Sequence, residues 1–193
     1  MNQQHNTLQN APAESRLAIW MTTLGALARL IPHPANFTPV GSLSLFAGSR
    51  MAGWQAYFIP LLLMAVTDPI IGYAYGFAAY SATTPFIYAS FLINVWIGQR
   101  LLRNVNFLRL GSVVMLASLQ FFLLTNVGVW LNSGMYAKSF SGLLACYIAA
   151  IPYYGRTLAG DLFYAAVFFG LYTMAKRLTR PAGATLAVTN SRS

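Results

Sequence analysis

Long apolar stretches, separated by short polar or proline-containing breaks, occupy the chain from residue 17 to residue 178. They cover residues 17–31, 39–48, 54–73, 85–102, 107–131 and 162–178. Since about 20 apolar residues cross the hydrocarbon core of a bilayer, this pattern predicts about six transmembrane helices. Residues 141–152 are apolar but too short to cross, so they predict a re-entrant or interfacial helix. The pattern therefore indicates an all-α integral membrane protein with a single transmembrane domain at residues 17–178.

The two ends of the chain lack such stretches. Residues 1–16 and 179–193 are polar or small and show no apolar face that could pack. Because so little apolar surface cannot offset the entropy lost on ordering, both ends are predicted to be disordered tails. The first residues also lack the charged start and apolar core of a secretory signal peptide.

Charge then adds orientation to this picture. Only 8% of the residues are charged and 57% are hydrophobic, as expected for a protein whose solvent is lipid. The net charge of +9 comes from basic residues beside the predicted helices, and Lys and Arg mark cytoplasmic loops. The clusters that fix the orientation are Arg100, Arg103, Arg109, Lys176, Arg177 and Arg180. They predict that both termini are cytoplasmic, with Lys138 and Arg156 as outer exceptions, and they argue against a nucleic-acid partner.

Three segments on or near the predicted outer face carry an unusual number of Asn, Pro, Gly and aromatic residues. They are IPHPANFTPVGSLSLFAG at 31–48, LTNVGVWLNSGMY at 124–136 and CYIAAIPYYGRTLAGDLFY at 146–164. Through these segments the chain resembles an uncharacterised family of small bacterial inner-membrane proteins. The resemblance implies a multi-pass location in the bacterial inner (plasma) membrane, but no known activity.

The predicted six-helix layout with elaborate outer loops is also similar to the S components of energy-coupling-factor vitamin transporters, a likeness of layout alone. That likeness implies a small-molecule solute, contact with membrane lipid, and energising ATPase and transmembrane partner subunits. S components dock such partners through small residues on the first helix, where this chain has Ala18, Thr22 and Ala26 at small-xxx-small spacing.

Asp68 and Asp161 are the two acids within the predicted transmembrane domain, and an intramembrane acid suggests a functional site. Asp68 precedes Pro69, which removes a backbone donor and frees a carbonyl, so a ligand, cation or proton site is one interpretation. The other is a structural carboxylate that caps a helix or pairs with Arg29, which needs an acid. Asp161 is expected to open the last helix, where it would cap free amides, pair with Arg156 or bind a ligand.

Further ligand-binding candidates lie in the outer segments. Asn126, Trp130 and Tyr136 offer amide groups and flat rings, which suit a planar heterocycle or a sugar-like solute. An aromatic belt at the membrane surface is the alternative for the rings. Asn36 either turns the chain into the second helix or contributes to the site.

Metal and cofactor chemistry find little support in the sequence. His33 is one of two histidines and Cys146 is the single cysteine, so no multi-His or multi-Cys cluster can form. A mixed site of His33, Cys146 and the two acids is conceivable, but no spacing demands it. No cofactor is predicted.

These observations favour a binding or translocation subunit for a small organic solute, vitamin-like or nucleobase-like, that enters from the outer face. No GxxxxGK[ST] motif occurs, so the chain itself is not expected to hydrolyse ATP. The alternatives are a structural or accessory inner-membrane protein and, less favoured, a membrane enzyme with Asp68 and Asp161 as acid and base. Because no HExxH or GxSxG motif occurs, the protein is not predicted to be an enzyme.

Overall fold

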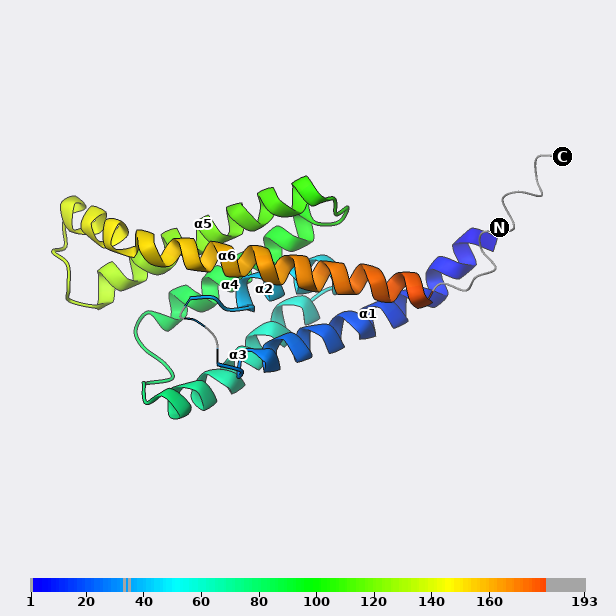
Figure 1. The fold of residues 1–193 in the computed structure, drawn as a ribbon, viewed down its shortest axis with the longest axis horizontal. Helices are drawn as coiled ribbons and strands as arrows, with labels where there is room; N and C mark the ends of the chain where they lie inside the picture. The colour runs from blue at the N-terminus through cyan, green and yellow to red at the C-terminus, as the bar shows by residue number, and fades with distance from the viewer. Residues whose placement is uncertain (1, 33, 35, 180–193) are drawn as a thin grey trace.

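The structure is a computed structural model that describes residues 2–32, 34 and 36–179, and this part of the chain is helical with no β-strand. Its six helices form one elongated bundle (Figure 1). They are α1 (Asn2–Ala28), α2 (Val40–Arg50), α3 (Gln55–Tyr75), α4 (Thr84–Leu101), α5 (Phe107–Asn132) and α6 (Phe140–Thr179). An all-helical fold follows from apolar stretches that satisfy their own backbone hydrogen bonds.

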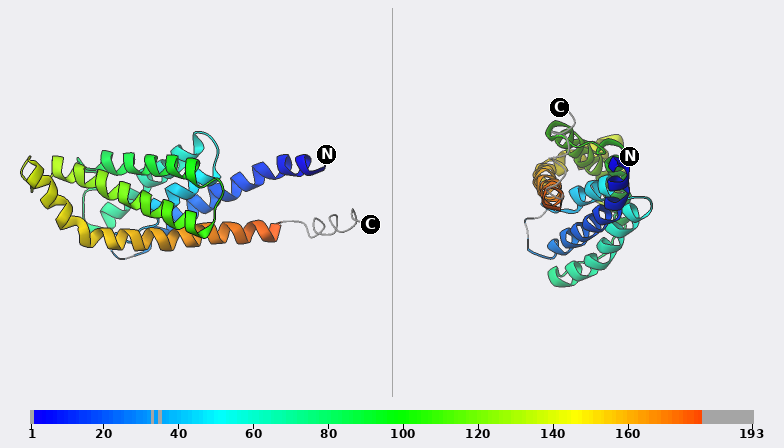
Figure 2. Two further views of the ribbon diagram at one scale, coloured as in Figure 1. Left: turned by 90° about the horizontal axis from the view of Figure 1, so that it is seen from above. Right: turned by 90° about the vertical axis from the view of Figure 1, so that its right-hand side faces the viewer.

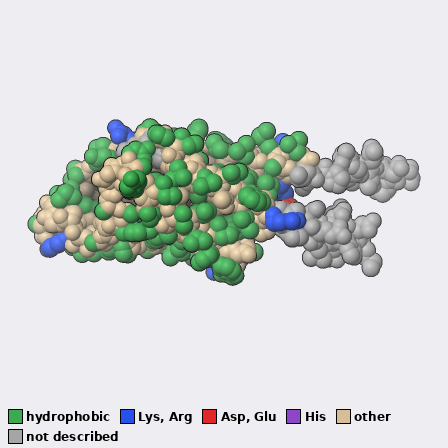
Figure 3. Space-filling model, turned by 90° about the horizontal axis from the view of Figure 1, so that it is seen from below, with side chains coloured by type: hydrophobic (Ala, Val, Ile, Leu, Met, Phe, Trp, Pro, Cys, Tyr) green, Lys and Arg blue, Asp and Glu red, His purple; other side chains and the backbone are tan. Residues whose placement is uncertain are grey.

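Three of the helices are long and apolar enough to cross a membrane: α3, α5 and the part of α6 at Phe140–Leu178. This number corrects the prediction of about six. In the other three the reason is local: the first half of α1 is polar, α2 has only 11 residues, and α4 carries Asn94, Gln99 and Arg100 within 18 residues. The face shown in Figure 3 is largely covered by hydrophobic side chains, which fits a membrane protein.

The short helix α2 forms the centre of the bundle. Every residue from Val40 to Gly48 is buried, and Phe46 contacts the rings of Phe168, Phe169 and Tyr172 on α6. A helix that is apolar or small on all sides is stable only when neighbours cover it completely. At about 16 Å long, α2 reaches roughly half the depth of a bilayer core and so is no crossing by itself.

Two glycines bring α2 and α4 into close contact. A Cβ at Gly48 would overlap the backbone of Val95, and a Cβ at Gly98 would overlap the backbone of Leu45. At each of these two contacts, a glycine of one helix therefore lies directly against the main chain of the other helix. This is the small-residue packing by which helices approach closely without a large apolar driving force.

The segment 141–152 is not a separate re-entrant helix, because it is the first part of the 40-residue helix α6. Pro152 lies within α6, and Figure 2 shows that the helix bends in the part near it. A proline removes one intrahelical hydrogen bond and kinks a helix without ending it. At about 60 Å, α6 exceeds the thickness of a bilayer core, so it can hold both predicted segments.

The beginning of α1 and the end of α6 lie at the same end of the bundle (Figure 1). Glu14 and Lys176 form an ion pair of 2.7 Å there. Residues 2–16, predicted to be a disordered tail, belong to helix α1. Of the other predicted tail, Thr179 ends α6, and residues 180–193 lie outside the described residues.

The small-residue stripe on α1 faces into the bundle. Ala18, Thr22 and Ala26 are at most 3% exposed and belong to the interior that α2 and α6 complete. The Thr22 hydroxyl lies 3.7 Å from the sulfur of Met51, just beyond α2. The stripe therefore packs this chain against itself, which corrects the expectation that it docks a partner subunit.

Candidate functional site

A cavity of about 300 Å³ lies inside the bundle beside the amino end of α2. Its walls come from α2 to α6, from Arg29, Asn36 and Thr38 between α1 and α2, and from the irregular segment 76–83 between α3 and α4. Irregular backbone inside an apolar bundle is tolerated where it lines a polar cavity. The polar residues that line it are Arg29, Asn36, Thr38, Asp68, Ser81, Thr84, Tyr88, Thr157 and Asp161, and the apolar ones include Met64, Phe91 and Phe121.

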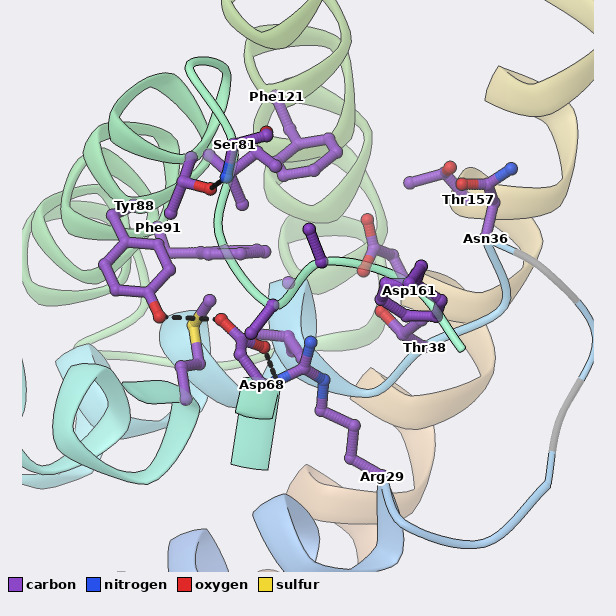
Figure 4. A pocket seen from close by; sticks show the side chains of 18 residues that line it. Arg29, Asn36, Thr38, Asp68, Ser81, Tyr88, Phe91, Phe121, Thr157 and Asp161 are labelled. Carbon is purple, nitrogen blue, oxygen red and sulfur yellow. Dashed lines mark hydrogen bonds and ion pairs between the residues drawn. The ribbon is translucent and has the colours of Figure 1, made fainter. Parts of the chain in front are cut away.

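One wall is built around Asp68 (Figure 4). Its Oδ1 pairs with Nη1 of Arg29 at 2.6 Å, and its Oδ2 accepts a hydrogen bond of 2.6 Å from the hydroxyl of Tyr88. Nη1 of Arg29 also donates to the hydroxyl of Thr67 at 2.9 Å. Asp68 and Arg29 are thus partners, as one interpretation of the sequence predicted, and Tyr88 completes the pairing of the carboxylate.

The proline after Asp68 shapes the same region. Pro69 has no N–H to donate to the carbonyl of Ala65, four residues earlier in α3. The hydroxyl of Tyr80 donates to that carbonyl at 2.8 Å and so ties segment 76–83 to α3. The freed carbonyl therefore positions a loop at the cavity instead of facing the cavity unpaired.

Asp161 lies on the opposite side of the cavity, in the middle of α6 (Figure 4). It does not open a helix as predicted, because α6 begins far earlier at Phe140. The residue is 5% exposed, and its Oδ2 accepts a 2.5 Å hydrogen bond from the hydroxyl of Ser118 on α5. Within the described residues Asp161 makes no ion pair, with Arg156 or with any other cation.

The amino end of α2 abuts the Asp161 carboxylate. A Cβ at Gly41 would overlap Oδ1 of Asp161, so only glycine admits this approach. The hydroxyl of Ser42 donates to the Asp161 carbonyl at 2.5 Å. Because the first amides of a helix have no intrahelical acceptor and form the positive end of its dipole, α2 is oriented to stabilise negative charge at Asp161.

The segment before α2 is held on α6 next to Asp161. Asn36 has a φ of 65°, a left-handed conformation that asparagine tolerates better than most residues, so it makes the predicted turn and also lines the cavity. The ring of Phe37 contacts Phe163 and Tyr164, with centroids 5.7 and 5.6 Å away. Gly160 allows this approach, since a Cβ there would lie 3.0 Å from Cα of Phe37.

The predicted cluster of Asn126, Trp130 and Tyr136 is not part of this cavity. The side-chain amide of Asn126 donates to the carbonyl of Phe122, and the indole of Trp130 donates to the carbonyl of Ala137, both at 2.8 Å. Tyr136 lies in the connection between α5 and α6. These residues hold the carboxyl end of α5 and the following turn, whereas Asn36, Asp68 and Asp161 converge on the cavity.

The mixed metal site that the sequence left open has no counterpart among the described residues, which contain no group of three His, Cys, Asp or Glu side chains placed to hold a metal. Cys146 is buried on α6, with its sulfur 3.6 Å from the carbonyl of Asn126. His33 lies outside the described residues.

The family model described as a family of unknown function (DUF6580) matches residues 9–183. The chain belongs to this family. A comparison with curated proteins found no match, and a comparison with solved structures found none either. Family membership agrees with the uncharacterised family expected from the sequence segments, and the cavity residues all fall within the matched region.

Sequence reasoning missed several residues of the cavity. Tyr88 and Ser118 bind the two carboxylates, and Thr38 and Thr157 line the wall near Asp161. A signal existed for Tyr88, a hydroxyl within an apolar helix that requires a polar partner. Thr157 and Ser118 had no such signal, because a serine or threonine in a helix can satisfy itself on the preceding turn.

Proposed function

We propose that the protein is a membrane-embedded binding and translocation subunit for a small organic solute. The observation that supports this most is the cavity between Asp68 and Asp161, which joins charged, amide and hydroxyl groups to an apolar wall. Ligand sites are typically concave and mostly apolar with a few convergent polar groups, and 300 Å³ is at the small end of their range of about 300–1,000 Å³.

The two carboxylates suggest the chemistry of the solute. Both oxygens of Asp68 are engaged by Arg29 and Tyr88, whereas Asp161 accepts hydrogen bonds from the hydroxyl of Ser118 and the backbone amide of Ser42 but pairs with no cation among the described residues. A cationic or hydrogen-bond-donating group of the solute would therefore bind Asp161. The apolar part, vitamin-like or nucleobase-like in its flatness, would lie against Phe91 and Phe121, whose rings are 5.1 Å apart by centroid.

This arrangement favours binding over catalysis. An acid–base pair needs a carboxyl group free to exchange a proton with the substrate, and the ion pair with Arg29 withdraws Asp68 from that role. We therefore do not assign an enzymatic activity. A purely structural or accessory role would not account for the polar residues that line the cavity.

We further propose that the bundle sits in the bacterial inner membrane in contact with lipid and with both termini in the cytoplasm. The support is that Arg50 and Lys176 line one cavity at the end of α6, and that the turn between α4 and α5, which contains Arg103, lies at that same end of the bundle (Figure 1). The cavity would then open toward the outer side. ATPase and transmembrane partners remain part of the proposal but must dock elsewhere than at the buried stripe of α1.

The test is native mass spectrometry of the full chain, gently solubilised from its host. The wild-type protein is expected to retain a small molecule, and Asp161→Asn is expected to lose it. Glu14→Gln is the matched control, since Glu14 is the third acid of the chain and lies outside the cavity. Equal retention by Asp161→Asn and Glu14→Gln would contradict the proposed site.

A further inference from the structure

A second cavity, of about 230 Å³, lies at the opposite end of α2 from the solute cavity. It is formed where the last residue of α2 meets the last turns of α6, and its lining residues are Arg50, Tyr172, Thr173, Lys176 and Arg177. Three of these five side chains are cationic. A concentration of positive charge in a concave site indicates an anionic ligand.

Arg50 is the central group of this cavity. Its guanidinium lies over the rings of Phe169 and Tyr172, 5.6 and 5.1 Å from their centroids. Its Nε is buried without a hydrogen-bond partner, and no carboxylate of the described residues lies within ion-pair distance of it. The rings therefore hold the half-buried guanidinium in place, and no paired acid among the described residues neutralises its charge.

The neighbouring charges do not close this gap. Glu14 is the one acid near these cations among the described residues: it pairs with Lys176 at 2.7 Å, accepts a hydrogen bond from Tyr172 and attracts Arg50 from beyond ion-pair distance. One acid therefore faces three cations, of which Arg177 is exposed. The cavity keeps a positive balance although it is next to the carboxyl ends of two helices. Those ends attract cations, but the partial charge of a helix end, about half an elementary charge, is smaller than that of a bound anion.

We propose that this cavity binds the phosphate group of an anionic phospholipid. A guanidinium presents paired donors that match phosphate oxygens, and an ammonium adds a point charge. The cavity also lies at the end of the stretch of α6 that is apolar enough to cross a membrane, Phe140–Leu178, which is where lipid headgroups are expected. On the side of α6 away from the cavity, Leu171, Met174 and Leu178 are 53%, 60% and 85% exposed, as suits a helix in contact with lipid. Figure 3 shows Lys and Arg side chains beside the hydrophobic surface near this end of the bundle.

A lipid headgroup fits both the positive charge of the cavity and its position at the end of a membrane-spanning stretch, whereas a water-soluble phosphate fits the charge alone. Basic cavities between helices at the cytoplasmic side of membrane proteins are suited to anionic headgroups. The inference does not depend on the solute cavity, since the two cavities share no residue.

The test measures lipid binding to the full chain in detergent micelles by native mass spectrometry. Phosphatidylglycerol, phosphatidylcholine and inorganic phosphate are the three probes. Phosphatidylglycerol is expected to bind best, and Arg50→Gln to weaken it about five-fold, which corresponds to about 1 kcal/mol for one cation near a headgroup. Arg50→Lys should restore part of the loss, since it keeps the charge but not the paired donors.

Arg103→Gln is the matched control, with the same change of charge in the turn between α4 and α5 at the same end of the bundle. It should bind phosphatidylglycerol as the wild type does. If Arg50→Gln does not fold, Arg177→Gln, which alters an exposed residue of the cavity, should show a smaller loss in the same direction.

Two results would overturn the proposal. One is equal binding of phosphatidylglycerol by Arg50→Gln and Arg103→Gln. The other is Arg50-dependent binding of inorganic phosphate with no preference between the two lipids, which would assign the cavity to a water-soluble phosphate compound.

Discussion

The two ends of helix α2 treat charge in different ways. At its amino end, the Asp161 carboxylate accepts a hydrogen bond from Ser118 and lies at the positive end of the α2 dipole, and the nearby Asp68 is paired with Arg29. At its carboxyl end, Arg50 is stacked on rings but has no paired acid among the described residues. At the solute cavity the fold thus pairs or hydrogen-bonds its buried charged groups. At the other end of α2 it leaves Arg50 without a paired acid, so that this cation is available to an external partner.

This difference separates charges that stabilise the fold from charges available for ligands. Removing one partner of an enclosed pair leaves the other uncompensated and costs stability. Removing a charge with no internal partner should cost little stability and should instead change binding. Four substitutions are taken from the largest expected effect on stability to the smallest. Three alter these charges or their partners, and Gly98→Ala tests how α2 is held between them.

Asp68→Asn should destabilise the protein most, by about 3 kcal/mol, since it leaves the largely enclosed guanidinium of Arg29 without its counter-charge. The free energy of unfolding would be measured by denaturant titration in detergent micelles. The double variant Arg29→Gln/Asp68→Asn should recover much of the loss, because neither charge then remains alone. Additive losses in the double variant would show that the two residues act separately.

Gly98→Ala should lower the free energy of unfolding by about 2 kcal/mol, because its Cβ would overlap the backbone of Leu45 and push α2 from α4. Gly170→Ala is the control, a helical glycine with open space around it. There alanine should be neutral or stabilising by up to about 1 kcal/mol, since it is the better helix former. Equal changes at both glycines would mean that α2 is not seated through close backbone contact.

Much of the fold could be predicted from the sequence, because apolar stretches in lipid can only form helices or closed barrels. The need of Arg29 for an acid, with Asp68 as a candidate, followed in the same way from the cost of an unpaired charge. The role of α2 was harder to see. Residues 39–48 are apolar or small on every side, which indicates complete burial, but their length was interpreted as a crossing.

Two other interpretations of the sequence differ from the arrangement in the structure for local physical reasons. The polar residues between 152 and 162 suggested a loop, yet α6 continues through them, with Arg156 exposed and Asp161 turned into the bundle. Asn126 and Trp130 suggested a ligand site because their polar groups need partners, but backbone carbonyls supply those partners. Composition shows that a polar group must be satisfied; it does not show whether backbone, side chain or ligand satisfies it.

Ser118→Ala should cost about 1.5 kcal/mol, since the Asp161 carboxylate loses its side-chain donor in a buried setting. Ser112→Ala, on the exposed face of the same helix, should change stability by less than about 0.5 kcal/mol. Unfolding of both variants in the same micelles measures the difference. If both substitutions lower the free energy of unfolding equally, then α2, and not Ser118, stabilises the Asp161 carboxylate.

Arg50→Gln should have the smallest effect on stability, about 0.5–1 kcal/mol, which is the value of a cation–π contact near the surface. The measurement is thermal unfolding in lipid-free detergent, repeated with phosphatidylglycerol. Because a ligand that binds only the folded state raises its stability, the lipid should raise the unfolding temperature of the wild type more than that of the variant. A loss as large as that of Asp68→Asn would remove the contrast between the two ends of α2, since Arg50 would then serve the fold as Asp68 does.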